Sequence, residues 1–218
     1  HNTARSAALS GFFVTGTDTE VGKTLVSAWL LTQLDAAYWK PIQAGTVPTT
    51  DSATVQQLAE LPVSRVLPEA YLLPEPMAPH EAARRANIAL DMAKIKLPPH
   101  DGLVVVEGAG GLMVPIAAGA YMIDLADQLD LPIILVARST LGTINHTLLS
   151  LEAIRRRGLP LAGIVISGPE TPHNRAAIER FGKVEVIAEI PQLETVDRDT
   201  LKAIAPELDL LKLATVRP

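Results

Sequence analysis

Residues 14–24 read Val-Thr-Gly-Thr-Asp-Thr-Glu-Val-Gly-Lys-Thr, and they are the strongest indication of the fold in this sequence. An apolar run over residues 9–15 predicts a buried strand before it, and a helical pattern follows over residues 22–34. A strand, a glycine-containing loop ending in Gly-Lys-Thr and a helix form a phosphate loop when they occur in this order. The glycines allow a tight backbone whose N–H groups point inward, and the helix N-terminus adds its dipole. Lys23 can then reach the β- and γ-phosphates of a nucleoside triphosphate, and the Thr24 hydroxyl can bind Mg²⁺.

The spacing of this loop is unusual, because five residues rather than four separate Gly16 from Gly22. The alternative is a glycine-capped turn with a chance Lys-Thr, and the order of strand, loop and helix argues against it. The sequence has no Asn-Lys-x-Asp guanine reader and no Asp-x-x-Gly switch after a strand, which argues against a regulatory GTPase. It also lacks the second, early lysine of the partition-type ATPases. These differences favour metabolic chemistry over signalling.

Apolar runs that predict strands alternate with helical patterns along the rest of the chain. Strands are predicted at residues 38–43, 102–106, 133–137, 161–166 and 184–190, with an extended piece near 70–73. Helices are predicted at residues 52–61, 79–89, 121–129, 143–157 and 174–181, with a short helical turn at 92–96. This alternation predicts an α/β fold of the P-loop NTPase type: one domain over residues 1–218, with a doubly wound, mostly parallel sheet and helices on both faces. Residues 1–8 are expected to be frayed or partly vector-derived.

Composition excludes several classes of function. The net charge of −5 argues against a broad nucleic-acid surface, which needs a basic face. No window of 18 uncharged apolar residues occurs, so no membrane-spanning helix is predicted. The absence of cysteine among the 218 residues excludes disulfides, thiolate metal sites and cysteine nucleophiles. We expect a cytoplasmic protein that binds neither nucleic acid nor membrane.

Two charged residues follow the second predicted strand. Lys40 begins the sequence Lys-Pro-Ile-Gln-Ala-Gly, and a lysine there can offset the charge that develops during phosphoryl transfer. The alternative is a solvated lysine at the edge of the sheet. Asp51 follows a threonine-rich loop and stands where a helix N-cap is expected. It is equally a candidate Mg²⁺ ligand beside Thr24, because Mg²⁺ takes only one or two carboxylates in addition to phosphate oxygens and water.

Two further segments lie after predicted strands, where ligands gather in a parallel sheet. Residues 104–111 read Val-Val-Val-Glu-Gly-Ala-Gly-Gly, which places the Glu107 carboxylate at the carboxyl end of a central strand, a common position for a metal-coordinating acid. The glycines let a ligand approach the backbone closely. The alternative is a glycine-rich turn with an incidental glutamate. Residues 141–146, Leu-Gly-Thr-Ile-Asn-His, open a long helix whose free N–H groups can hold a carboxylate, although an ordinary cap explains them equally well.

Together these segments resemble the dethiobiotin synthetase family, over about residues 13–193. The most specific matches are residues 14–24, 40–43, 106–111 and 141–146, and members of the family share the five-residue glycine spacing. The resemblance implies an ATP-dependent cyclo-ligase of biotin biosynthesis that converts 7,8-diaminononanoate, CO₂ and ATP into dethiobiotin, ADP and phosphate. One amine traps CO₂ as a carbamate, ATP phosphorylates the carbamate, and the neighbouring amine closes the ring with the advantage of proximity.

The resemblance also implies a role for individual residues. Lys23, Lys40 and Thr24 would be catalytic, and Thr24, Asp51 and Glu107 would hold Mg²⁺. The nucleotide would contact Glu20, Val21, Gly22, Lys23, Thr24, Leu25, Asp51, Glu107, Gly108, Ala109, Gly110, Ser167, Gly168, Pro191, Gln192 and Leu193. The diamine would contact Thr17, Lys40, Ala44, Gly110, Gly111, Gly142, Thr143, Ile144 and Asn145. The family is homodimeric, and residues 142–145 of one subunit would receive the carboxylate of a substrate bound mainly by the other.

The chain departs from the family pattern at two positions. Ala44 stands where many members have Ser or Thr, so one hydroxyl contact to the substrate is lost. Ser167 stands where members can carry an adenine-reading Asn, and a hydroxyl makes fewer hydrogen bonds than an amide, which predicts a weaker preference for ATP over other nucleoside triphosphates. Two rival functions stay open: another ATP-dependent ligase, such as an amidotransferase-type enzyme, and a nucleotide-switched partner protein without substrate chemistry.

Overall fold

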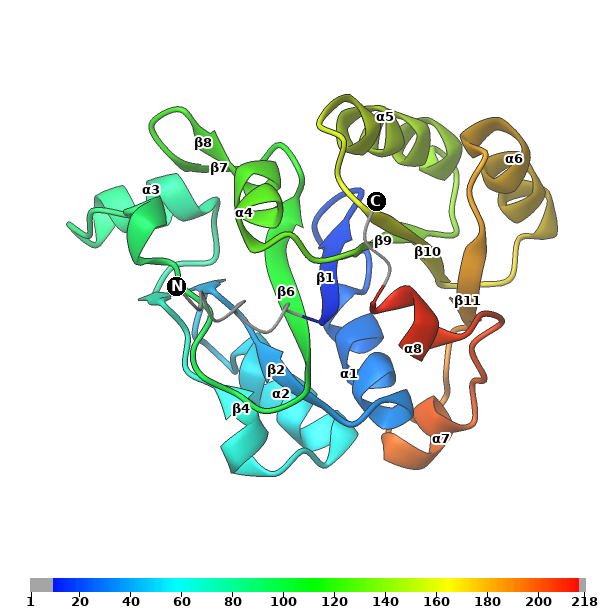
Figure 1. Cartoon of the computed structure of the whole chain (residues 1–218), viewed down its shortest axis with the longest axis horizontal. Helices are drawn as coiled ribbons and strands as arrows, with labels where there is room; N and C mark the ends of the chain where they lie inside the picture. The colour runs from blue at the N-terminus through cyan, green and yellow to red at the C-terminus, as the bar shows by residue number, and fades with distance from the viewer. Residues whose placement is uncertain (1–9, 216–218) are drawn as a thin grey trace, which may run out of the picture.

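A seven-stranded parallel sheet forms the centre of the computed structural model, which describes residues 10–215 (Figure 1). The strand order is β11-β10-β9-β1-β6-β2-β4, and every neighbouring pair is parallel. The strands are β1 (Gly11–Gly16), β2 (Ala36–Trp39), β4 (Val66–Leu67), β6 (Leu103–Gly111), β9 (Ile133–Arg138), β10 (Leu161–Ser167) and β11 (Val186–Ile190). The predicted parallel sheet is therefore confirmed, while the expectation for residues 1–8 lies outside the described residues.

Helices cover both faces of this sheet (Figure 1). One face carries α1 (Lys23–Gln33), α2 (Asp51–Ala59), α7 (Arg198–Lys202) and α8 (Leu210–Leu213), and the other carries α4 (Met122–Leu129), α5 (Thr143–Arg156) and α6 (Pro172–Gly182). Side chains of β1 alternate between the two layers: Phe12 and Val14 pack with the first set of helices and Phe13 with the second. Burial on both faces explains why the strands read as continuous apolar runs, and the doubly wound fold is confirmed.

The predicted strand over residues 38–43 is wrong in one respect, because it is two strands in two sheets. β2 ends at Trp39 in the central sheet, and β3 (Ile42–Ala44) pairs instead with β5 (Tyr71–Leu73), close to the extended piece predicted there. Pro41 has no N–H for the ladder of the central sheet. Its carbonyl oxygen accepts hydrogen bonds from the backbone N–H groups of Ala70 and Tyr71, which directs the chain toward β5.

The glycine-rich segment after the three valines is also different from the prediction. β6 does not end at residue 106 but continues through the glycines to Gly111, which pairs with Gly16 of β1. A Cβ atom on Gly111 would lie 3.3 Å from the Gly16 carbonyl oxygen, so glycine permits this close approach. The segment is therefore a strand that lies against the phosphate loop rather than a turn.

Other differences are confined to short elements. The helix predicted over residues 79–89 ends early, as α3 (Pro79–Arg85), and the predicted helical turn near 92–96 is a 3-10 turn, η2 (Met92–Lys94). Six elements had no prediction: η1 (Val63–Arg65), β4, the antiparallel pair β7 (Pro115–Ala117) and β8 (Ala120–Tyr121), and the short helices α7 and α8. Elements of two to five residues are too short to show a hydrophobic period.

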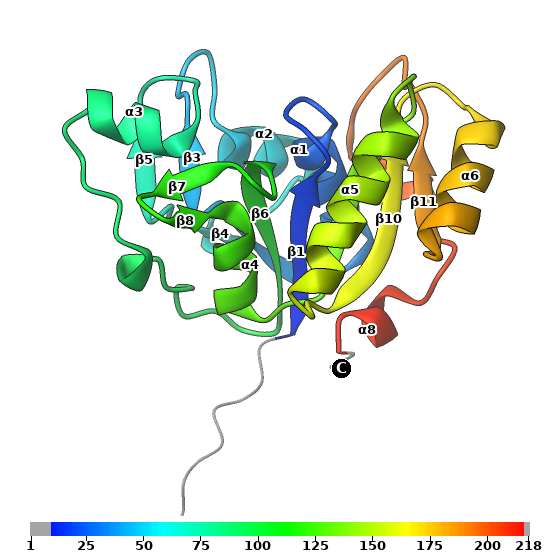
Figure 2. The same cartoon turned by 90° about the horizontal axis from the view of Figure 1, so that it is seen from above.

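The carboxyl ends of the strands gather at one edge of the molecule. In Figure 2 the strands point to the upper edge, where the loop between β1 and α1 lies beside the loops that follow β3, β9 and β10. This is the edge at which parallel α/β sheets bind ligands. Within residues 10–215, no helix combines the length and apolar character needed to cross a membrane.

Candidate active site

The phosphate loop joins β1 to α1 as predicted. Gly22 is the N-cap of α1 and has a φ of 98°, in the left-handed region that favours glycine. A Cβ atom at this position would also lie 2.7 Å from Ser167 Oγ. No side chain caps the helix, so the N–H groups of its first turn face the loop and suit an anion. Lys23 Nζ folds back over the loop and donates a hydrogen bond to the Asp18 carbonyl oxygen at 3.1 Å.

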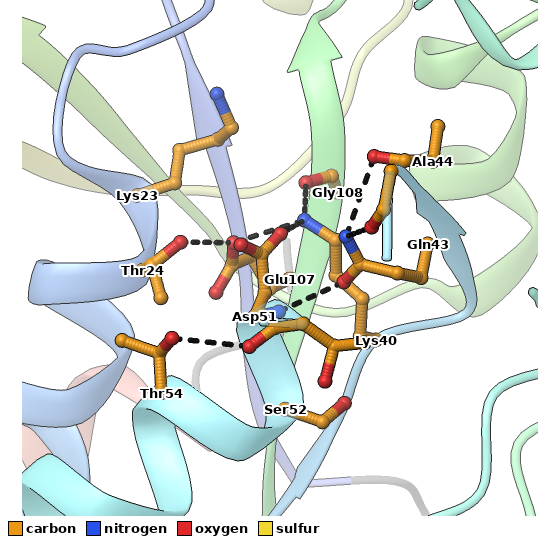
Figure 3. Close-up of polar contacts among 12 residues, drawn as sticks. Lys23, Thr24, Lys40, Gln43, Ala44, Asp51, Ser52, Thr54, Glu107 and Gly108 are labelled. Carbon is orange, nitrogen blue, oxygen red and sulfur yellow. Dashed lines mark hydrogen bonds and ion pairs between the residues drawn. The ribbon is translucent and has the colours of Figure 1, made fainter. Parts of the chain in front are cut away.

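Four predicted site residues meet beside this loop (Figure 3). The Lys40 ammonium lies 2.6 Å from Asp51 Oδ2 and 2.9 Å from Glu107 Oε1. It also donates to the Gly108 carbonyl oxygen at 3.0 Å, which uses its third proton. Thr24 Oγ1 donates to Glu107 Oε1 at 3.0 Å. Residues from α1, α2, β6 and the end of β2 are thereby brought to one point by the parallel arrangement of the strands.

Burial decides between the interpretations that the sequence left open for Lys40 and Glu107. Only 3% of Lys40 and 0% of Glu107 is exposed, so neither is a solvated or incidental charge. Burial by itself opposes the charge on Lys40, but the carboxylates of Glu107 and Asp51 outweigh it and raise the pKa of the lysine. Lys40 therefore stays protonated across the working pH range.

Lys23 shows the opposite shift. Burial, followed by repulsion from Lys40, lowers the pKa of Lys23 from 10.5 to about 8, and the carboxylates of Glu107, Asp51 and Asp18 only partly compensate. Two lysines with separated pKa values thus lie in one site, which is a common feature of functional sites.

Tyr38 is a site residue that the sequence analysis missed. It lies on β2, is 0% exposed, and donates its phenol proton to Glu107 Oε2 at 2.9 Å. Burial, and then the Glu107 carboxylate, raise the pKa of this phenol well above its ordinary value, so it stays a donor. Residues 36–39 read Ala-Ala-Tyr-Trp, which indicates only an apolar strand, and nothing local signals the contact to Glu107.

Gln43 was likewise predicted only as part of a motif, without a role. Its side chain is buried, donates from Nε2 to the Gly45 carbonyl oxygen at 2.8 Å, and accepts at Oε1 from the Asp51 N–H at 3.0 Å. The expected N-cap role of Asp51 is wrong, because Thr50 is the N-cap of α2 and its side chain accepts from the Ala53 N–H. Asp51 is the first helical residue, so its carboxylate is free to turn toward Lys40.

The oxygen donors of this cluster fit Mg²⁺. Thr24, Asp51 and Glu107 supply a hydroxyl and two carboxylates, the hard oxygen ligands that Mg²⁺ prefers. The two carboxylates converge on a single cationic atom, Lys40 Nζ, so a cation is accommodated between them. Among the described residues, no group of three or more His, Cys, Asp and Glu side chains could hold a metal ion. Phosphate oxygens and water would therefore complete the coordination.

A cavity of about 850 Å³ opens over this cluster. Its walls include the predicted residues Glu20, Gly22, Lys23, Thr24, Leu25, Lys40, Ala44, Asp51, Glu107, Ala109, Gly110 and Gly111. Val21 is buried beneath the loop, and Gly108 takes part through its carbonyl oxygen. Residues 76–79, which carry two prolines and for which we predicted no role in the site, form a further wall.

A second cavity of about 370 Å³ continues from the first, since Asp18, Gly111 and Val114 line both. It contains the predicted substrate residue Thr17 and extends to His146 and Leu149 of α5. Other predicted residues line neither cavity: Gly142, Thr143, Ile144, Asn145, Ser167, Gly168, Pro191, Gln192 and Leu193.

These remaining residues fall into two places. Residues 142–145 form the start of α5, next to Leu141, which is 96% exposed. Ser167 ends β10 beside the phosphate loop, and the Gly168 N–H donates to the Ile190 carbonyl oxygen at 3.0 Å. Residues 191–193 directly follow Ile190, the last residue of β11. The proposed base site therefore lies on the Gly22 side of the loop, away from Lys40.

Comparison with known proteins shows which protein family this chain resembles. The family model described as "AAA domain" matches residues 10–200. The chain is 53% identical over 198 residues to the ATP-dependent dethiobiotin synthetase BioD of Paramagnetospirillum magneticum, which covers 91% of this chain and 96% of that protein. It is 52% identical over 202 residues to the biotin biosynthesis bifunctional protein BioCD of Bordetella avium, covering 92% of this chain and 43% of that longer protein.

Comparison with a solved structure supports the fold but gives no information on the function. A ParA family ATPase from Chlorobium tepidum TLS superposes with a TM-score of 0.51 and 12% identity, over 95% of this chain and 97% of that one. Identity at that level carries no information on substrate, whereas the full-length similarity to the synthetases does. On the basis of that similarity, the chain belongs to the family of ATP-dependent dethiobiotin synthetases.

Proposed function

We propose that this chain catalyses the ATP- and Mg²⁺-dependent closure of the ureido ring of dethiobiotin from 7,8-diaminononanoate and CO₂. The relatives' shared name supports the reaction. The observation that carries the assignment is the Lys40 ammonium held between Asp51 and Glu107, beside the phosphate loop and inside one cavity. That arrangement brings a cation to the place where a carbamate and a γ-phosphate would meet.

The phosphate loop and the start of α1 would bind the triphosphate. Backbone N–H groups and the helix dipole favour the phosphates, and Lys23 can exchange its bond to the Asp18 carbonyl oxygen for a phosphate oxygen. Thr24, Asp51 and Glu107 would hold Mg²⁺, which neutralises charge on the β- and γ-phosphates when bound. Because Thr24 and Glu107 already touch, little rearrangement of these side chains is required.

The substrate would lie across the two connected cavities. One amine adds to CO₂ and loses a proton, which leaves an anionic carbamate. Lys40 would bind this carbamate by exchanging one of its three present hydrogen bonds for a carbamate oxygen. A carbamate oxygen then takes the γ-phosphoryl group from ATP and releases ADP. The second amine attacks the carbamate carbon, the bond from that carbon to the phosphorylated oxygen breaks, and phosphate leaves with the proton that the amine loses, which closes the ring. The walls of the cavity contribute by holding both amines near the same carbon atom.

We also propose that the chain acts as a homodimer through the face that carries the second cavity. Leu141, Leu149 and Met113 are large apolar side chains exposed on or beside this face. Residues 142–145 line neither cavity of their own protomer, which supports a contribution to the partner's substrate site. Leu149→Asp should shift the protein to monomers in multi-angle light scattering and raise the KM for the diamine. A Leu149→Asp protein that is still dimeric with an unchanged KM would refute this interface.

The nucleotide base is expected to be read weakly. Ser167 stands beside Gly22 and offers a single hydroxyl, which can make fewer hydrogen bonds than an amide. The test compares kcat/KM for ATP, CTP and GTP in the native chain and in Ser167→Asn. The proposal fails if the native chain prefers ATP as strongly as the variant does.

The reaction itself is tested by mass spectrometry of the product from diamine, bicarbonate and ATP. We expect dethiobiotin to form only when all three are present, and ADP release to depend on the diamine. Steady ATP hydrolysis without diamine, and without product in its presence, would instead favour the nucleotide-switched alternative.

A further inference from the structure

The feature that leads beyond the proposed function is the buried pair of Tyr38 and Glu107. Tyr38 pairs with Val105 across β2 and β6, and Glu107 is two residues farther along β6 on the same face. The phenol can therefore reach along the strand to the carboxylate, 2.9 Å away. Both side chains are fully buried, and Tyr38 otherwise belongs to the apolar layer that also contains Phe12 and Val105.

The two oxygens of the Glu107 carboxylate have different partners. Oε1 accepts from Thr24 and from Lys40, both of which line the cavity. Oε2 accepts from Tyr38, and no other side chain or backbone group among residues 10–215 donates to it. One oxygen thus faces the phosphate loop, and the other faces the core.

We infer that Tyr38 is a positioning residue, whose hydroxyl holds Glu107 Oε2 in the core and so presents Oε1 alone to the Mg²⁺ of the bound nucleotide. This inference rests on the proposed role of Glu107 as a metal ligand. Partners in the second layer around a metal set the orientation of its ligands, and their loss costs metal affinity.

The physical consequence of losing the hydroxyl follows from burial. Without it, Oε2 would be a charged oxygen in an apolar layer with no donor, which is unfavourable. The carboxylate would gain by rotating so that both oxygens reach Thr24 and Lys40. Rotation would disturb the single-oxygen geometry offered to the metal, while the backbone cradle for the phosphates would stay unchanged.

The test is Tyr38→Phe, which removes one hydroxyl and keeps the ring that packs in the core. Tyr71→Phe is a control, because Tyr71 also lies on a strand, its phenol oxygen accepts a hydrogen bond from the Asp91 N–H at 3.1 Å, and neither Tyr71 nor Asp91 lines a cavity. Affinity for a non-hydrolysable ATP analogue is measured by calorimetry without Mg²⁺ and over a Mg²⁺ titration, and circular dichroism checks the fold.

We expect Tyr38→Phe to raise the half-saturating Mg²⁺ concentration by about 10- to 100-fold. Its affinity for the Mg²⁺-free analogue should equal that of the wild type, and Tyr71→Phe should match the wild type in both measurements. A Tyr38→Phe protein that is less stable to heat but keeps the wild-type Mg²⁺ dependence would overturn the inference, because a purely structural role produces that result.

The variant Glu107→Gln tests the metal-ligand role of Glu107 separately from the positioning role of Tyr38. If Glu107→Gln raises the Mg²⁺ requirement and Tyr38→Phe does not, the metal assignment stands and the positioning role is overturned. If Glu107→Gln leaves the requirement unchanged, the metal assignment fails and the inference fails with it. If the wild type forms no dethiobiotin but Tyr38→Phe still raises the Mg²⁺ requirement, the inference holds and the assigned reaction is wrong.

Discussion

Replacing Lys40 by methionine should weaken both the fold and the reaction. The substitution keeps the length and most of the volume of the side chain, but removes the ammonium between Asp51 and Glu107. Lys40 and Glu107 are almost wholly buried, so the variant leaves a buried carboxylate without its cation. The change therefore separates the electrostatic role of Lys40 from its packing.

The size of the effect can be worked from the distances. Two unit charges 2.9 Å apart attract by about 6 kcal/mol at an effective dielectric constant of 20, before the cost of desolvating them is subtracted. Removing one partner of a buried pair costs about 3–5 kcal/mol in practice. Asp51 is 33% exposed in its side chain and is screened by water, so its pair adds little. We expect the free energy of unfolding to fall by about 3 kcal/mol.

Urea denaturation with linear extrapolation measures this loss directly. For a domain of this size, about 3 kcal/mol corresponds to a fall in Tm of roughly 6–12 °C. The kcat for dethiobiotin formation should fall by about 100- to 1,000-fold, as when one preorganised donor to a developing anion is removed. A Mg²⁺-nucleotide complex should stabilise the variant more than the wild type, because its cation can replace the missing charge.

Lys96→Met is the matched control, since Lys96 is exposed and forms no ion pair among the described residues. Its unfolding free energy should change by less than about 0.5 kcal/mol. A Lys40→Met enzyme with wild-type kcat, and with a stability loss no larger than that of Lys96→Met, would refute both the buried-pair argument and the catalytic role.

Two further outcomes follow from the same site. The pKa of Lys23 is about 8 in the folded protein and 10.5 unperturbed, so the unfolded chain binds more protons between pH 8 and 10.5. The free energy of unfolding should therefore rise with pH over that window. Urea titrations at stepped pH should show this rise in the wild type and not in Lys23→Met. Gln43→Leu should raise the half-saturating Mg²⁺ concentration by about tenfold or more. The substitution removes the hydrogen bonds to the Gly45 carbonyl and the Asp51 N–H, which hold Asp51 in place. An unchanged Mg²⁺ titration curve would contradict this prediction.

The phosphate loop could be predicted from sequence because its parts are contiguous. Residues 14–24 contain the strand end, the glycines, the lysine and the helix start, so local rules suffice. The alternation of strands and helices could be predicted for the same reason, since the spacing of apolar residues within each segment indicates whether it is a buried strand or a helix. The predicted end of a strand was wrong where the strand pairs with a segment distant in sequence. β6 continues through the glycines because Gly111 pairs with Gly16 of β1.

The polar cluster shows what local patterns cannot supply. Lys40 and Glu107 were each open to a trivial interpretation, and only their contact, across 67 positions of sequence, excludes it. Tyr38 lies 69 positions from Glu107 and looks like an ordinary strand residue, so no spacing rule could have found it. The preference of Asp for N-caps pointed to Asp51, whereas its neighbour Thr50 takes that place.

The parallel α/β sheet and the phosphate loop with an extra residue between its glycines could therefore be predicted from the amino-acid sequence alone. Backbone periodicity and loop chemistry act over a few neighbouring residues, so local patterns are sufficient for both. The tertiary structure was needed to show that Lys40 is a buried cation between two carboxylates, and that one oxygen of Glu107 bonds Tyr38 in the core while the other bonds Thr24 and Lys40 at the cavity. Those facts depend on strand order and register, which bring distant residues within hydrogen-bonding distance and exclude water from between them.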